Sequence, residues 1–226
     1  MRTIGLIGGM SWESSAVYYR AINELVRDRL GGHHCARSLL ATIQFADLAP
    51  LQAAGDWDAA NALVADAARS LADGGAECVV ICANTMHLAV DAVRAAVELP
   101  VIHIGDCTAD AIRTAGVDRV AWLATRYTME LPFLREHLAA RGVECVVPDE
   151  TERDDIQRII YDELVQGRVV RESRERLIEI VRRLDAPGVA LACTELGLLL
   201  APADIEIPLF DTAQIHAAAA VDWALS

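Results

Sequence analysis

The chain contains no lysine, and all 20 of its cationic side chains are arginine. This excludes a Schiff base between lysine and pyridoxal phosphate, and it excludes the lysine of a Walker A phosphate loop. If the protein acts at the α-carbon of an amino acid, it does so without that electron sink. The chain also lacks a basic block, and its formal net charge is −13. Because nucleic-acid affinity comes largely from neutralising phosphates, we expect no nucleic-acid partner.

None of the six cysteines forms a C-x-x-C pair. Their spacing suits neither a zinc ribbon nor the disulfide framework of a secreted protein, so we expect no metal site. The N-terminus lacks a signal-peptide layout, and there is no run of about 20 apolar residues that could span a membrane. We therefore expect reduced thiols in a cytoplasmic protein that has no membrane partner.

Apolar segments and amphipathic, helix-like segments alternate along the 226 residues, of which 54% are hydrophobic. Segments that are apolar on both faces are typical of central parallel strands covered by helices. The strands are expected at 3–7, 39–45, 76–82, 100–104, 119–124, 143–147, 188–192 and 205–209. Helices are expected up to residue 30 and at 56–73, 87–97, 106–115, 129–141, 152–166, 173–184 and 212–225. Residues 47–55 are expected to form a loop, and 125–128 a polar turn.

The second half of the chain restarts the strand and helix pattern of the first. We therefore predict an α/β fold with two pseudo-symmetric lobes, each a parallel sheet flanked by helices. The N-terminal lobe is expected to comprise residues 1–104 together with 208–226, because the C-terminal helix returns to it, and the C-terminal lobe residues 105–207. Ligands of such sheets bind at the carboxyl ends of strands, so the active site is expected at the lobe interface.

Two of the predicted strands end in thiol and hydroxyl side chains, at residues 79–87 and 189–196. Such groups suit proton abstraction at a carbon next to a carboxylate, where a thiolate with a tuned pKa serves as the base. The enediolate that develops needs hydrogen-bond donors, which strand-to-helix turns supply. Side chains of the right type stand at these strand ends, namely Asn84, Thr85, Thr125, Thr128 and Thr194.

Several motifs stand out along the chain, namely Gly8-Gly9-Met10-Ser11-Trp12-Glu13-Ser14 with Tyr18-Tyr19, Ala83-Asn84-Thr85-Met86-His87, Thr125-Arg126-Tyr127-Thr128-Met129, Ile160-Tyr161-Asp162-Glu163-Leu164, Cys193-Thr194-Glu195-Leu196 and Phe210-Asp211-Thr212. Through these motifs the chain resembles the cofactor-independent aspartate/glutamate racemase superfamily over essentially its whole length. The resemblance is specific for the branch of bacterial aspartate or broad-specificity amino-acid racemases, and it implies two pseudo-symmetric α/β lobes, an interface site, no cofactor and a homodimer.

One catalytic position departs from the family pattern. The family's first catalytic residue directly precedes Asn-Thr and is usually cysteine, or threonine in some broad-specificity members; here it is Ala83. Alanine can neither take nor give a proton. Cys82 lies one residue earlier, and because strand side chains alternate between faces, we interpret it as a core thiol with a stand-in role as the alternative. Cys193 matches the second catalytic cysteine.

The resemblance implies an isomerase that acts on aspartate, glutamate or a related amino acid by proton transfer at the α-carbon. With Ala83 inert, three alternatives stay open: a one-base lyase or decarboxylase that uses Cys193 alone, as in the superfamily's arylmalonate decarboxylases; a catalytically impaired ligand-binding homologue; or an engineered replacement at residue 83. A distal carboxylate would need an arginine, and Arg126 is preferred over Arg168 and Arg20. The expected substrate-binding residues are Met10, Gln52, Asn84, Thr85, Thr125, Arg126, Thr128, Thr194 and Glu195.

Overall fold

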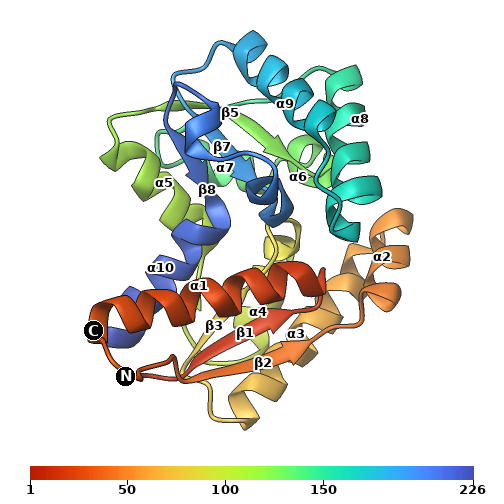
Figure 1. Ribbon diagram of the computed structural model, residues 1–226. Helices are drawn as coiled ribbons and strands as arrows, with labels where there is room; N and C mark the ends of the chain where they lie inside the picture. Colours follow the sequence, from red (N-terminus) through yellow and green to blue (C-terminus); the bar gives the residue numbers. More distant parts are fainter. The chain divides into compact units, whose positions relative to one another are not determined.

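The computed structural model describes residues 1–226, which fall into two compact units (Figure 1). Unit 1 comprises Met1–His103 and His216–Ser226, and unit 2 comprises Ile104–Ile215. The sequence placed residues 208–215 with the first unit, but here they belong to the second. The reason is that strand β8 (Leu209–Asp211) pairs with strand β7 (Val189–Ala192).

Unit 1 contains a parallel four-stranded sheet in the order β2-β1-β3-β4. Its strands are β1 (Ile4–Gly8), β2 (Ser38–Thr42), β3 (Cys78–Ile81) and β4 (Val101–Ile102). Its helices are α1 (Trp12–Leu30), α2 (Phe45–Ala54), α3 (Trp57–Asp73), the 3₁₀ turn η1 (Thr85–Ala89) and α4 (Val90–Ala96). Helix α10 (Thr212–Leu225) contributes its residues from His216 onward.

The sheet of unit 1 is covered on both faces, which explains why its central strands β1 and β3 are apolar throughout. Ile7 of β1 packs with Val79 and Ile81 of β3 in one cluster with the buried faces of α3 and α4. Helix α1 covers the opposite face (Figure 1). A parallel sheet covered in this way buries its central strands on both sides, whereas the edge strand β2 is partly exposed.

Unit 2 contains a second parallel sheet in the order β6-β5-β7-β8. Besides β7 and β8, its strands are β5 (Arg119–Ala124) and β6 (Glu144–Val146). Its helices are α5 (Ile104–Thr114), α6 (Arg126–Glu130), α7 (Phe133–Ala139), α8 (Glu150–Arg158) and α9 (Arg171–Leu184). A π-helical turn, η2 (Ile159–Glu163), and three 3₁₀ turns, η3 (Leu164–Gln166), η4 (Thr194–Leu198) and η5 (Pro202–Asp204), complete it.

The two units repeat one plan. In each, the first strand lies between the second and the third, and the fourth strand pairs with the third. The connections are similar as well: in each unit helices follow the first and the second strand, and a 3₁₀ turn follows the third. The predicted α/β fold with two pseudo-symmetric parallel sheets is therefore confirmed.

The observed elements differ from the predicted ones mainly in the positions of helices. Residues 47–55 are not a loop; they lie in α2, which contains Pro50 and ends at Gly55 in the left-handed conformation. The predicted turn at 125–128 is largely α6, and the predicted helix 152–166 is α8 followed by the π-helical and 3₁₀ turns. None of the helices is both long enough and apolar enough to cross a membrane.

Candidate functional site

Ala83 and Cys193 occupy equivalent positions in the two sheets. In unit 1 the backbone N–H of Val79 donates to the carbonyl of Pro100 at 2.9 Å. In unit 2 the backbone N–H of Val189 donates to the carbonyl of Pro208, also at 2.9 Å. Counting along each strand from these matching bonds, Ala83 falls at the position of Cys193.

The same count places Cys82 at the position equivalent to Ala192, so Cys82 does not correspond to the cysteine of unit 2. Its side chain is 1% exposed, and its thiol donates to the carbonyl of Val80 at 3.8 Å. Burial raises the pKa of the Cys82 thiol well above its usual range. These are the surroundings of a core thiol, and such a group forms thiolate only at a high energetic cost.

The segment after β3 is fixed by contacts within unit 1. The Nδ1 of His87 hydrogen bonds to the carbonyl of Ala83 at 2.9 Å, which makes this nitrogen the donor and sets the direction of the turn. Asn84 is buried, whereas Ala83 and Thr85 are partly exposed. Gln52, 6% exposed on α2, donates to the sulfur of Met86 at 3.2 Å. A buried glutamine amide on α2 therefore packs against the turn that follows the Ala83 position.

The glycine-rich turn after β1 is held by its own side chains. Gly9 has φ +86, and a Cβ there would lie 2.0 Å from the carbonyl oxygen of Ile43. Its N–H donates to the hydroxyl of Ser15 at 2.8 Å, and Ser11 caps α1 by accepting from the N–H of Ser14. These backbone N–H groups of the turn therefore donate to side chains of the protein itself. Met10 lies partly exposed at the carboxyl end of the sheet.

In unit 2 the Cys193 thiol lies against a buried carboxylate. Its Sγ is 3.1 Å from Oε2 of Glu195, and the hydroxyl of Thr194 donates to the same oxygen at 2.7 Å. All three residues are buried, with exposed fractions of 7% or less. Burial raises the pKa of the Cys193 thiol well above its usual range, and the Glu195 carboxylate adds to the rise. At neutral pH the thiol therefore holds its proton and directs it at Glu195.

The segment after β5 places two hydroxyls together at the carboxyl end of the sheet. The side-chain oxygens of Thr125 and Thr128 lie 3.2 Å apart, and the indole of Trp122 donates to the carbonyl of Thr128 at 3.3 Å. Thr128 is buried and Thr125 is partly exposed.

The preferred cation for a distal carboxylate, Arg126, is already engaged. Its guanidinium pairs with Asp154 and lies 3.7 Å from Glu130. Its backbone N–H donates to the side-chain oxygen of Gln157 at 2.8 Å. Arg168, the next choice, donates to the carbonyl of Asp162. The geometry of unit 2 therefore assigns Arg126 to the link between α6 and α8.

Two residues near Cys193 carried no assigned role in the sequence. The pKa of the Tyr161 phenol is raised to about 12, chiefly by burial and to a smaller extent by the nearby Tyr127, Cys193 and Glu195. Burial also raises the pKa of Asp211, although its carboxylate accepts from the N–H groups that open α10. Both residues lie within motifs on which the resemblance is based, and this was the only indication in the sequence that they lie near the site.

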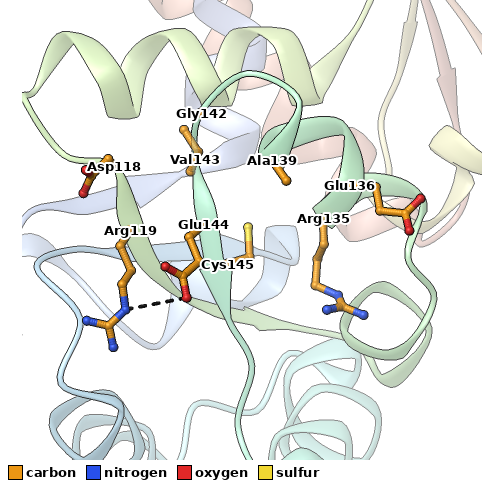
Figure 2. Close-up of a pocket in the computed structure, with 9 residues that line it drawn as sticks. All are labelled: Asp118, Arg119, Arg135, Glu136, Ala139, Gly142, Val143, Glu144 and Cys145. Carbon is orange, nitrogen blue, oxygen red and sulfur yellow. Dashed lines mark ion pairs between the residues drawn. The ribbon is translucent and has the colours of Figure 1, made fainter.

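A surface pocket of about 650 Å³ lies elsewhere in unit 2 (Figure 2). It is lined by the start of β5, by α7 and by β6, and Arg119 forms an ion pair with Glu144 at 4.0 Å within it. Because it is at the amino ends of the strands, it lies at the opposite end of the sheet from Cys193 and Thr125. It is therefore no part of the candidate site.

Comparison with known proteins assigns the chain to a family. Residues 7–220 match the Asp/Glu/hydantoin racemase family. The chain belongs to this family. Among solved structures, it is similar to a candidate Asp/Glu racemase from Yersinia pestis, with 45% identity, a TM-score of 0.92 and 100% of each chain covered. An aspartate racemase homologue from Pyrococcus horikoshii OT3 shows 31% identity and a TM-score of 0.88, with 100% of each chain covered.

The fold extends to more distant members of this racemase family. The Picrophilus torridus aspartate racemase is 18% identical, with a TM-score of 0.79, and the match covers 99% of this chain and 94% of that one. At that identity the likeness establishes the fold and not the substrate. Family membership and the parallel two-sheet architecture are therefore shown, whereas the substrate and the roles of individual residues are proposals.

Proposed function

We propose that this racemase-family protein moves a proton at the α-carbon of aspartate, glutamate or a related amino acid, without a cofactor, and that Cys193 is the acid–base group. The observation that carries the proposal is the buried Cys193 thiol at 3.1 Å from the Glu195 carboxylate. The family match supports the reaction class, and the absence of lysine rules out catalysis through a pyridoxal Schiff base.

The Cys193–Glu195 pair provides a low-cost route to a buried thiolate. When Cys193 acts as the base, its proton passes to Glu195, and the thiolate then takes the α-proton of the substrate. The pair keeps one negative charge throughout this transfer, so no additional charge is buried. When Cys193 acts as the acid, the neutral thiol favoured by burial donates its proton to the enediolate. Thr194 orients Glu195 by donating to it at 2.7 Å.

The α-carboxylate becomes an enediolate in the transition state and needs donors that are fixed in advance. In this proposal Thr125 and Thr128 supply them from the carboxyl end of β5, and the resemblance of the sequence implies the same role for Asn84 and Thr85 after β3. Met10, Gln52 and Thr194 shape their surroundings. The homodimer and the cytoplasmic location expected from the sequence belong to the same proposal, and sedimentation analysis tests the former.

Exchange of the α-proton in D₂O tests the reaction class directly. L- and D-aspartate and L- and D-glutamate are incubated with the protein, deuterium at the α-carbon is followed by NMR, and configuration is followed by circular dichroism. We expect exchange that falls on the order of 10²–10⁴-fold in Cys193→Ala. Exchange that continues undiminished in Cys193→Ala would contradict the assigned role of the thiol. Cys82→Ala is the matched control and is expected to keep the wild-type rate.

A one-base reaction is the second candidate, and Ala83 favours it. The resemblance of the sequence implies a second acid–base group at residue 83, where Ala83 carries a methyl group that can neither take nor give a proton. A one-base lyase or decarboxylase protonates an enediolate on one face only. Deuterium incorporation with retention of configuration supports this candidate, whereas formation of the mirror-image amino acid supports racemisation. Ligand binding without any exchange supports the third alternative, a catalytically impaired homologue.

A further inference from the structure

We propose that Tyr161 is a further catalytic residue beside Cys193 in unit 2, where its phenol donates a hydrogen bond to the carboxylate of the substrate as it becomes an enediolate. This assignment rests on the proposed function. It is argued from the π-helical turn that carries Tyr161, from the hydrogen bonds that hold this turn, and from the groups that surround the phenol within unit 2.

A π-helical turn at Ile159–Glu163 follows directly on α8 and leads into the 3₁₀ turn η3. The N–H of Leu164 donates to the carbonyls of Ile159 and Ile160, so one residue more than usual is fitted into the turn. Such single turns recur at functional sites because the extra residue changes the direction of the side chains that follow. Here the residue at the centre of the turn is Tyr161.

The turn is fixed from the core side by a buried carboxylate. Glu163 is 8% exposed and accepts from the hydroxyl of Ser173 and from the guanidinium of Arg158, both at 2.6 Å. The following 3₁₀ turn, η3, packs against η4, the segment that begins directly after Cys193. The π-helical turn is therefore held at both ends and is brought beside the Cys193 segment.

The phenol of Tyr161 is also oriented from the α6 side. The side-chain oxygen of Gln157 accepts from the backbone N–H of Arg126 at 2.8 Å, which leaves the amide NH₂ of Gln157 to face the phenol. The Gln157 side chain hydrogen bonds to Tyr161, in the sense expected of a donor to the phenolic oxygen. The O–H of Tyr161 is then left to donate. Cys193 and Glu195 lie near enough to interact with it electrostatically.

This arrangement suits a neutral donor. Because burial raises the pKa of Tyr161 to about 12, the phenol keeps its proton at neutral pH and takes no part in proton exchange. Its hydrogen bond stabilises the negative charge that develops on the carboxylate oxygens while Cys193 transfers the α-proton. A preorganised donor of this kind is worth most in the transition state, because it needs no reorganisation at that point.

Tyr161→Phe tests the proposal, with Tyr19→Phe as the matched control because Tyr19 is 56% exposed on α1 of unit 1. The α-proton exchange of L-aspartate and L-glutamate in D₂O is measured for both variants and for the wild-type chain. We expect Tyr161→Phe to lower kcat on the order of 10²-fold with a smaller change in KM, and Tyr19→Phe to leave both unchanged. Gln157→Met keeps the phenol but removes the hydrogen bond that orients it, so we expect a smaller decrease in kcat.

The outcomes separate this assignment from the proposed function. Loss of a donor to an oxyanion typically lowers the rate far more than threefold. If Tyr161→Phe exchanges the α-proton at a rate within about threefold of the wild-type rate, the role of Tyr161 is wrong and the proposed function still stands. A rise in KM at unchanged kcat overturns the role of Tyr161 too, because the phenol would then contribute only uniform binding. Absence of exchange by the wild-type chain contradicts the proposed function and this assignment together. Urea unfolding of each variant identifies any loss that comes from misfolding.

Discussion

At the scale of single residues, Ala83 is the position where one substitution should change the reaction. It falls at the strand position that Cys193 occupies in unit 2, and it is partly exposed. We expect Ala83→Cys to raise the rate of two-way racemisation on the order of 10²-fold or more, because a missing acid–base group typically costs that much. The ratio of racemisation to α-proton exchange in D₂O measures the effect. No rise in this ratio would mean that another group already serves that face.

Cys193 could be proposed as the catalytic thiol from the sequence because it stands directly before Thr194 in a recognisable motif. The core position of Cys82 was also predicted, because side chains alternate between the faces of a strand, and the pairing register places it at the position of Ala192 in unit 2. The contacts of Arg126 could not be predicted. An arginine at a strand end looks like a carboxylate receptor until Asp154, distant in sequence, is found paired with it.

At the scale of elements, the π-helical turn depends on Glu163. We expect Glu163→Ala to lower the free energy of unfolding by roughly 2–3 kcal/mol, because it leaves the buried Ser173 hydroxyl and Arg158 without their shared acceptor. The rate of α-proton exchange should fall with it, since Tyr161 is carried by the same turn. Urea denaturation at pH 7 measures the first effect and NMR the second.

The control for this change is Glu175→Gln, which removes an exposed carboxylate paired with Arg171 at 2.8 Å on α9. Exposed pairs contribute little, so no measurable loss of stability is expected. A destabilisation by Glu163→Ala no larger than that of the control would show that the turn is held by packing alone.

Helix α2 and the π-helical turn show where periodicity is not enough to predict an element. Pro50 removes one backbone donor from α2 and argues for a loop, yet Leu48 and Gln52 are buried against unit 1, and this packing overrides the penalty. The segment that contains Tyr161 keeps a helical period in sequence, so nothing local reveals the extra residue in its turn. Both features are set by tertiary contacts.

At the scale of the whole molecule, the duplication was predictable because each half repeats the same order of apolar and amphipathic segments. The boundary between the units was harder to predict, because helix α10 begins in unit 2 and ends in unit 1. Its last turns close unit 1: the N–H of Arg2 donates to the carbonyl of Ala224 at 2.9 Å, and Arg29 pairs with Asp222. The two ends of the chain therefore stabilise one unit together.

His216 on α10 makes this closure dependent on pH. It is fully buried, its Nε2 donates to the carbonyl of Ile102 at 2.7 Å, and its Nδ1 accepts from the phenol of Tyr18 at 2.9 Å. The rings of His87 and Tyr18 pack against it, and His103 packs against His87. Burial lowers the pKa of His216 to about 4. Protonation of His216 would reverse the bond with Tyr18, whose phenolic oxygen would then have to accept, and it would place a positive charge in the core.

The folded chain should therefore lose stability as the pH falls from about 6.5, the pKa of an unperturbed histidine, toward about 4. In that window the unfolded chain binds a proton at this site and the folded chain does not, which costs up to about 3 kcal/mol. His216→Phe removes this contribution, so the stability gap between wild type and variant should narrow by that amount between pH 7.5 and pH 4. Urea unfolding at both values measures it, with His33→Asn in an exposed loop as the control. A gap that stays constant with pH would show that His216 keeps an ordinary pKa in the folded chain.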